Sequence, residues 1–86
     1  MARSRLEMYV DILKVLAHCG PMKITPITYK ANFNCSVLKG HLGFLVRQGF
    51  VDEQIVGKQK IIYSITQRGV MVLKYFKELK QEVPII

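Results

Sequence analysis

Residues 28–42, with the sequence TYKANFNCSVLKGHL, decide how the chain is expected to fold. A short helical pattern ends at Ala31, and a second one begins after only three residues. Asn34 suits the start of that second helix, because its side-chain oxygen can accept a hydrogen bond from a free backbone N–H. The second helix is predicted to run to about Gln48 and to end at Gly49 in a left-handed cap. Two helices joined by so short a turn indicate a helix-turn-helix.

One face of the second helix is predicted to be buried. Its apolar residues recur at helical spacing and are Leu38, Leu42, Leu45 and Val46. Phe33 is the apolar residue of the turn, and we expect it to fill the corner between the two helices. The alternative is an ordinary helical corner with no role in recognition, so the neighbouring elements matter for the choice.

The chain before the turn begins with a long helical pattern. Ser4 and Glu7 form a capping box, in which side chains satisfy free amide donors at the start of a helix. Gly20 and Pro21 are predicted to end this helix. Its apolar face is formed by Leu6, Tyr9, Val10, Leu13, Leu16 and Ala17.

A brief helix is predicted between the long helix and the turn. Thr25 suits its N-cap and Pro26 its first helical position, because proline lacks an N–H that would be unpaired there anyway. Ile27 and Ala31 should then point inward. Residues 22–24, just before this helix, could form a three-residue strand.

The chain after the turn predicts a β-hairpin and a final helix. Two runs rich in β-forming residues, 50–56 and 60–65, flank the turn sequence Gly57-Lys58-Gln59. Thr66 is then expected to cap a final helix, which Pro84 is expected to end.

The order of these elements is that of a winged helix-turn-helix domain. We therefore expect an α+β, mainly α fold with a three-helix core, a two-stranded wing and a C-terminal helix. Residues 1–86 are predicted to form one domain, since so short a chain leaves no room for a second core. The C-terminal helix, over about residues 66–82, is predicted to serve dimerisation.

Three stretches resemble a known family. They are ITYKANFN (27–34), LKGHLGFLVRQGFV (38–51) and YSITQRGVMVLKYF (63–76). The chain is similar over about residues 5–80 to small archaeal winged helix-turn-helix DNA-binding proteins, both the chromatin-associated type and related predicted transcription regulators. The resemblance implies double-stranded DNA as the partner. It also implies a homodimer, because the last helix of the chromatin-associated type pairs with its twin as an antiparallel coiled coil.

Basic and acidic residues are segregated along the chain. The net charge is +7, yet no acidic residue lies between Asp11 and Asp52 or from Gln54 to Lys77. A surface made only for solubility would mix the two signs. Segregation over the helix-turn-helix and the hairpin instead fits a surface that lies against phosphates.

The candidate DNA-binding residues lie in the turn, the second helix of the motif and the hairpin tip. In a helix-turn-helix, the second helix enters the major groove and its early residues meet base edges. Alternatively, Arg47 is only a solubilising charge, and Lys58 and Lys60 only keep an exposed hairpin from aggregating. The predicted set is Lys30, Asn32, Asn34, Ser36, Lys39, Gly40, Gly43, Arg47, Lys58, Gln59 and Lys60.

Two glycines inside the predicted recognition helix need an explanation. Gly40 and Gly43 each weaken a helix by about 1 kcal/mol relative to alanine. Spaced three residues apart, they would leave a bare strip that a sugar-phosphate strand could approach closely. Alternatively, they make room for a neighbouring helix or a bulky core side chain.

Apolar residues crowd the final helix more than one interface requires. Hydrophobic residues make up 50% of the chain, which is more than so small a domain can easily bury. A stripe with Val72, Phe76 and Leu79 can face away from the stripe with Leu73. The predicted dimer interface is Val72, Tyr75, Phe76 and Leu79. The alternative is a monomer in which the second stripe is internal.

Catalysis, metal binding and membrane insertion are not expected. Cys19 and Cys35 are predicted to be small buried hydrophobes in a reducing compartment, and their spacing from His18 and His41 matches no zinc motif. His41 is expected to be a packed, neutral core histidine. No catalytic arrangement is apparent, so we expect neither an enzyme nor a cofactor. No long apolar run is present, which favours a cytoplasmic, nucleoid-associated protein.

Two functions remain open at this point. The favoured one is double-stranded DNA binding by a dimer, as a transcription regulator or a nucleoid protein, with no small-molecule effector evident. The alternative is a winged helix that serves as a protein-protein interaction module in transcription or replication machinery. Charge segregation favours DNA.

Overall fold

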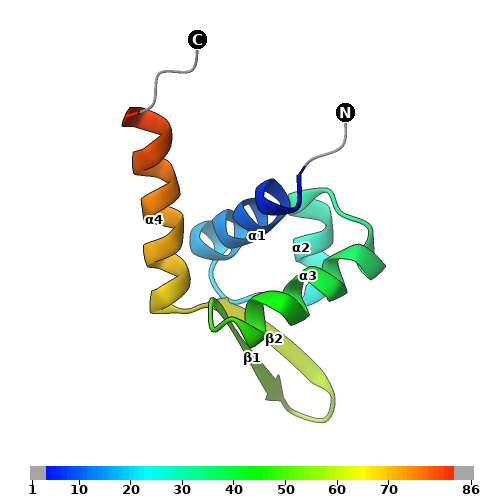
Figure 1. Cartoon of the computed structure of the whole chain (residues 1–86). Coiled ribbons are helices and arrows are strands. Elements are labelled where there is room, and N and C mark those ends of the chain that lie inside the picture. The colour runs from blue at the N-terminus through cyan, green and yellow to red at the C-terminus, as the bar shows by residue number, and fades with distance from the viewer. Residues whose placement is uncertain (1–3, 83–86) are drawn as a thin grey trace.

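Three helices, a hairpin and a fourth helix follow one another in the computed structural model, which describes residues 4–82, with side chains up to Leu79. Figure 1 shows α1 in the middle, with α2 and α3 on one side, α4 on the other and the hairpin projecting below. The expected end of the last helix at Pro84 lies outside the described residues. The elements are α1 (Arg5–Cys19), α2 (Ile24–Ala31), α3 (Cys35–Arg47), β1 (Val51–Val56), β2 (Lys60–Ile65) and α4 (Gln67–Glu82). The predicted fold class, four helices with a two-stranded antiparallel wing, is confirmed.

The ends of α1 are those that the sequence predicts. The Ser4 hydroxyl accepts a hydrogen bond from the backbone N–H of Glu7 at 3.1 Å. At the other end, Gly20 has a φ of 81°, which favours glycine, and its N–H donates to the Leu16 carbonyl.

The start of α2 corrects the sequence prediction. The helix begins at Ile24 with Lys23 as its N-cap, so Thr25 and Pro26 are its second and third residues. The cause is tertiary: Met22 and Tyr63 exchange two backbone hydrogen bonds of 2.9 and 2.8 Å in a one-residue antiparallel bridge. This bridge replaces the predicted three-residue strand and fixes where the helix can begin. Proline is tolerated because N–H groups of the first turn have no helical partner.

The turn between α2 and α3 is tightly determined. Asn32 adopts the left-handed conformation with a φ of 58°, and the Phe33 N–H donates to the Thr28 carbonyl at 3.1 Å. The Asn34 side chain accepts from the Ser36 N–H at 2.9 Å, which confirms its predicted role as N-cap. Gly49, just after α3, has a φ of 82°, as the sequence predicts for a left-handed cap.

The wing is a regular antiparallel hairpin that is anchored to α4 by Thr66. Its register pairs Val51 with Ile65 at the base and Val56 with Lys60 at the tip. The Thr66 hydroxyl accepts from the Gly69 N–H at 3.0 Å, which confirms the predicted cap, and donates to the Gly49 carbonyl at 2.7 Å. One threonine therefore joins the end of α3 to the start of α4.

The core lies between the three N-terminal helices and the base of the wing, with Leu73 added from α4. The predicted anchors Ile27, Ala31 and Phe33 are all buried there. Cys19 and Cys35 are both exposed, so their prediction as buried hydrophobes is wrong. Each occupies the terminal residue of a helix, outside the buried stripe of that helix. The full core is Ile12, Leu13, Leu16, Met22, Ile27, Ala31, Phe33, Leu38, Leu42, Leu45, Val51 and Leu73.

Candidate nucleic-acid interface

The outward face of α3 carries small side chains. Leu38, Leu42 and Leu45 are buried against the rest of the domain. At 100° per residue, the side opposite this stripe is formed by Ser36, Gly40, Gly43 and Arg47. Lys39 is exposed on the flank of this strip. The strip is therefore a shallow surface, with the charge of Lys39 at its edge and the charge of Arg47 at its C-terminal end.

The structure decides between the two interpretations of the glycines for the described residues. A Cβ atom at Gly40 would meet none of their atoms within 4 Å. A Cβ atom at Gly43 would meet only the Nη1 atom of Arg47, at 3.5 Å. Within residues 4–82, no neighbouring helix or core side chain occupies the space that the glycines leave, so that alternative is wrong for this part of the chain. The strip is open to a ligand.

Arg47 lies back along this strip. Its guanidinium reaches one helical turn toward the N-terminus, as its approach to Gly43 shows. A β-branched or long side chain at position 43 would compete for this space. The positive charge of Arg47 is thus carried over the open part of α3 rather than away from it.

Polar residues of the turn are exposed, but their side chains differ in role. Lys30, Asn32 and Asn34 are all exposed, as predicted. The Oδ1 atom of Asn34 is engaged by the Ser36 N–H, so its local role is to begin α3. Tyr29, which is not among the predicted DNA-binding residues, is 81% exposed beside Lys30. Its position outside the inward stripe of Ile27 and Ala31 is the sequence feature that indicates this exposure.

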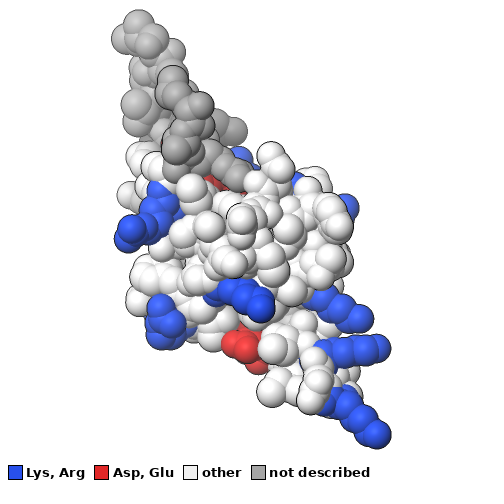
Figure 2. All heavy atoms as spheres, turned by 90° about the vertical axis from the view of Figure 1, so that its right-hand side faces the viewer, with Lys and Arg blue, Asp and Glu red and all other residues white. Residues whose placement is uncertain are grey.

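The wing tip presents cations and, unexpectedly, aliphatic side chains. Lys58, Gln59 and Lys60 are exposed as predicted. Ile55 and Ile61 are also exposed, although their residue type favours burial. Figure 2 shows Lys and Arg side chains projecting toward the lower end of the molecule, where the hairpin lies, with one small acidic patch nearby.

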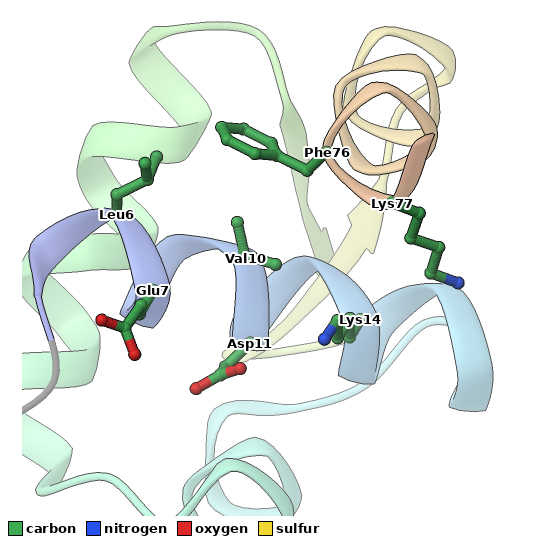
Figure 3. Close-up of a pocket in the computed structure, with 7 residues that line it drawn as sticks. All are labelled: Leu6, Glu7, Val10, Asp11, Lys14, Phe76 and Lys77. Atoms are coloured by element: carbon green, nitrogen blue, oxygen red, sulfur yellow. The ribbon is translucent and has the colours of Figure 1, made fainter. Parts of the chain in front are cut away.

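The predicted dimer residues divide between two sides of α4. Tyr75 and Leu79 are exposed. Val72 instead packs against the core together with Leu73, so the prediction that its stripe faces away from Leu73 is wrong for this residue. Phe76 is half-buried and reaches toward Leu6 and Val10 of α1, as Figure 3 shows.

A pocket of about 230 Å³ lies between α1 and α4. The Phe76 ring lies on the same side of the pocket as Leu6, whereas the charged side chains of both helices lie away from the ring (Figure 3). The remaining space explains why Phe76 is only half-buried. The lining residues are Leu6, Glu7, Val10, Asp11, Lys14, Phe76 and Lys77.

His41 is packed between α3 and α1. Its Nε2 atom lies 3.1 Å from the Met8 sulfur, and its ring meets the Tyr9 ring edge-on at 5.0 Å between centroids. Burial, and then the positive charge of Arg5, lower the pKa of His41 below its ordinary value of 6.5. His41 is packed as predicted but only partly buried, so it is not the core histidine that the sequence predicts, and its lowered pKa favours the neutral ring.

Two kinds of feature are absent from the part of the chain that the structure describes. Within residues 4–82, no three His, Cys, Asp or Glu side chains gather as metal ligands would. No helix in this range is both long and apolar enough to span a bilayer.

Comparison with known proteins relates this geometry to a family. The family described as winged helix-turn-helix matches residues 2–83 of the chain. The structure is similar to that of Sso10a-2, a DNA-binding protein from Sulfolobus solfataricus, with a TM-score of 0.81 and 26% sequence identity. That alignment covers 92% of this chain and 80% of Sso10a-2. None of the curated protein sequences is similar enough to count as a match.

Two further proteins share the fold at lower identity. The transcriptional regulator YodB from Bacillus subtilis aligns with a TM-score of 0.76 and 22% identity, over 94% of this chain and 90% of YodB. BpsR from Bordetella bronchiseptica aligns with a TM-score of 0.79 and 11% identity, over 87% of this chain. The chain spans only 54% of BpsR, about half its length. The resemblance to winged helix-turn-helix DNA-binding proteins, including an archaeal one, is therefore confirmed.

Proposed function

The chain belongs to the winged helix-turn-helix family, and on this premise we propose that it binds double-stranded DNA as a homodimer. Its role is that of a transcription regulator or a nucleoid protein. The observation that carries the proposal is the open outward strip of α3, where Gly40 has no described neighbour within 4 Å of its Cβ position.

The strip of α3 suits close approach to the major groove. A recognition helix meets bases with residues near its N-terminus, where Ser36 is exposed. Because the strip lacks large side chains, the helix axis can approach the groove closely. Lys39 on the flank, and Lys58 and Lys60 on the wing, then supply charge for the phosphates on either side.

The shortage of base-reading side chains favours low sequence specificity. Bidentate readout of bases uses Arg, Lys, Asn or Gln side chains that reach base edges. On the outward strip of α3, Arg47 is the one long side chain, and it starts from the last turn of the helix. Affinity should therefore come mainly from phosphate contacts, which carry no sequence information. This property favours the nucleoid role over regulation of single operators.

A second copy of the chain is proposed to pair through α4. Tyr75 and Leu79 are large, apolar and exposed on a helix that leans away from the other helices (Figure 1). Two-fold dimers are the commonest assemblies of soluble proteins. Pairing of two copies of α4 would bury these residues and bring two recognition helices to one duplex.

The test of DNA binding is a salt series with a charge-matched control. Mobility shifts on a duplex of random sequence should give a log K that falls steeply with log salt, by about 0.9 per phosphate contact. The variant Lys39→Ala/Lys58→Ala/Lys60→Ala should bind more weakly and with a shallower slope. Lys14→Ala/Lys74→Ala/Lys77→Ala removes the same charge from α1 and α4 and should behave like the wild type. A flat salt series, or equal effects of the two variants, contradicts the proposed DNA-binding face.

A further inference from the structure

An exposed aliphatic pair lies near the tip of the wing. Ile55 of β1 and Ile61 of β2 are directly opposite each other in the hairpin register. They are 73% and 38% exposed, respectively. One register step separates them from Val56 and Lys60, the pair that closes the hairpin. Two branched side chains are thus held side by side near the tip, with Ile55 largely exposed and Ile61 partly exposed.

The pair belongs to the face of the hairpin that is turned toward the helices. Side chains alternate between the two faces of a strand, so Ile55 shares its face with Glu53 and Val51. Val51 is buried in the same core as Leu42 and Leu45 of α3. The isoleucines therefore project on the side where α3 lies, but beyond the part of the face that the domain covers. A duplex bound along α3 would meet this face of the wing.

The charges around the pair favour a polyanion over a purely apolar partner. Lys58 lies in the turn and Lys60 in the closing pair, and both are exposed. Glu53 lies two residues from Ile55 on the same face, on the side toward the body. Phosphates would be attracted to the tip and repelled from the base of the wing. The hairpin can therefore enter a groove only as far as Glu53. The isoleucines lie between Glu53 and the tip, so they are in the part that can enter.

The pair has the chemistry of a minor-groove wedge. Proteins insert apolar side chains, isoleucine among them, between base steps from the minor groove. Proteins that place aliphatic side chains between base steps from the minor groove kink the duplex by about 20–90°.

We propose that the Ile55–Ile61 pair is an apolar wedge that enters the minor groove and bends the duplex, with Lys58 in the turn holding an adjacent phosphate. This inference rests on the proposed DNA binding and adds a structural consequence for the DNA. Bending of this kind needs no base-specific contact, in keeping with the bare strip of α3.

The experiment uses the full chain and a duplex of about 30 base pairs with a donor and an acceptor dye at its ends. Binding is measured by mobility shift and bending by energy transfer in the same samples. Ile55→Thr/Ile61→Thr removes the apolar wedge but keeps β-branched residues that suit a strand. Val56→Thr is the matched control, because Val56 is also exposed but lies on the opposite face of the hairpin. Thermal melts by circular dichroism check that both variants fold.

The wild type and Val56→Thr should raise energy transfer equally. The double variant should lose at most about tenfold in affinity, since phosphate contacts dominate binding, and its energy transfer should fall to the level of the free duplex. Binding by the wild type without bending, bending by the double variant, or equal losses in Val56→Thr would overturn the wedge alone. Self-association lost in the double variant with bending unchanged would overturn it in favour of a protein contact. No binding by the wild type would overturn the proposed function as well.

Discussion

Helices α3 and α4 use their apolar residues in opposite ways. In α3, the leucine stripe is buried and the outward strip is almost bare. In α4, Leu73 is buried, while Tyr75, Met71 and Leu79 are exposed. A helix with an emptied outer face suits a groove that must be approached closely, whereas one with a crowded outer face suits a protein partner. Under the proposed function, the first surface binds a polyanion and the second pairs with another copy of the chain.

The anchoring of α3 is the part of this comparison with the largest expected effect. Phe33→Ala should lower the free energy of unfolding by about 3–5 kcal/mol, because it removes a buried ring between α2 and α3. Tyr29→Ala is a matched control, since Tyr29 is exposed in the preceding helix; its change should stay within about 0.5 kcal/mol. Urea denaturation of both variants measures the difference. Equal midpoints would mean that the turn is not packed as described.

Glycines in the two helices should respond in opposite directions to the same substitution. Gly69→Ala in α4 would press a Cβ against the Phe50 carbonyl oxygen and to 2.8 Å from the Ile65 Cγ1 atom. It should destabilise the fold by about 1–3 kcal/mol. Gly40→Ala in α3 meets no described atom and should stabilise the helix by about 1 kcal/mol.

These two variants also separate stability from binding. Gly40→Ala should melt at a higher temperature than the wild type and yet bind DNA more weakly, because its methyl group lies on the strip of α3. Calorimetric melts and mobility shifts on the same preparations provide both quantities. Weaker binding without loss of stability would sharpen the contrast between the helices, and unchanged binding would show that the strip does not contact DNA.

The exposed face of α4 should affect association rather than folding. Tyr75→Ala should raise the dissociation constant of the dimer about tenfold, corresponding to about 1.4 kcal/mol. Lys74→Ala, a neighbouring exposed residue, is the control. Sedimentation equilibrium at micromolar concentration measures the mass of each. A wild-type mass that stays near 9.9 kDa at all concentrations would contradict the proposed dimer, because the exposed face of α4 would then have no partner.

The contact of His41 in α3 with α1 should make the free energy of unfolding depend on pH. We expect this effect to be smaller than those of the substitutions above. The pKa of His41 is lowered in the folded protein. As the pH falls below 6.5, the ordinary pKa of histidine, this residue therefore binds a proton more readily in the unfolded chain than in the folded one. The contribution of neutral His41 is therefore fully present above pH 6.5 and is lost as the pH falls toward the folded pKa. Urea midpoints between pH 5 and pH 8 test this. His41→Gln should flatten the dependence over the same range, and an unchanged profile would exclude His41 as its source.

Features that depend on local hydrogen bonds could be predicted from the sequence. Ser4, Asn34 and Thr66 cap helices as predicted, because a cap involves only residues a few positions apart. The start of α2 could not be predicted in this way. Its position depends on the bridge between Met22 and Tyr63, which are distant in the sequence.

The candidate DNA-binding surface also has features that follow from local sequence and others that depend on packing. The positions of Lys39 and Arg47 on α3 follow from helical periodicity alone, and both are exposed as expected. That nothing covers Gly40 within the described chain depends on how the other elements pack. The exposure of Ile55 was missed because its residue type indicates burial, and only the length of the wing beyond the core leaves it uncovered.

The order of helices and strands, the turn at Asn32 and the leucine stripe of α3 can all be predicted from the sequence. These depend on backbone preferences and periodicity, which act over one or two helical turns. Which side of α4 is covered depends instead on packing: Val72 is turned toward the core and Tyr75 is left outside. Both residues are apolar and adjacent helical faces look alike in sequence. Their difference arises because burial is set by the surfaces that distant segments bring together.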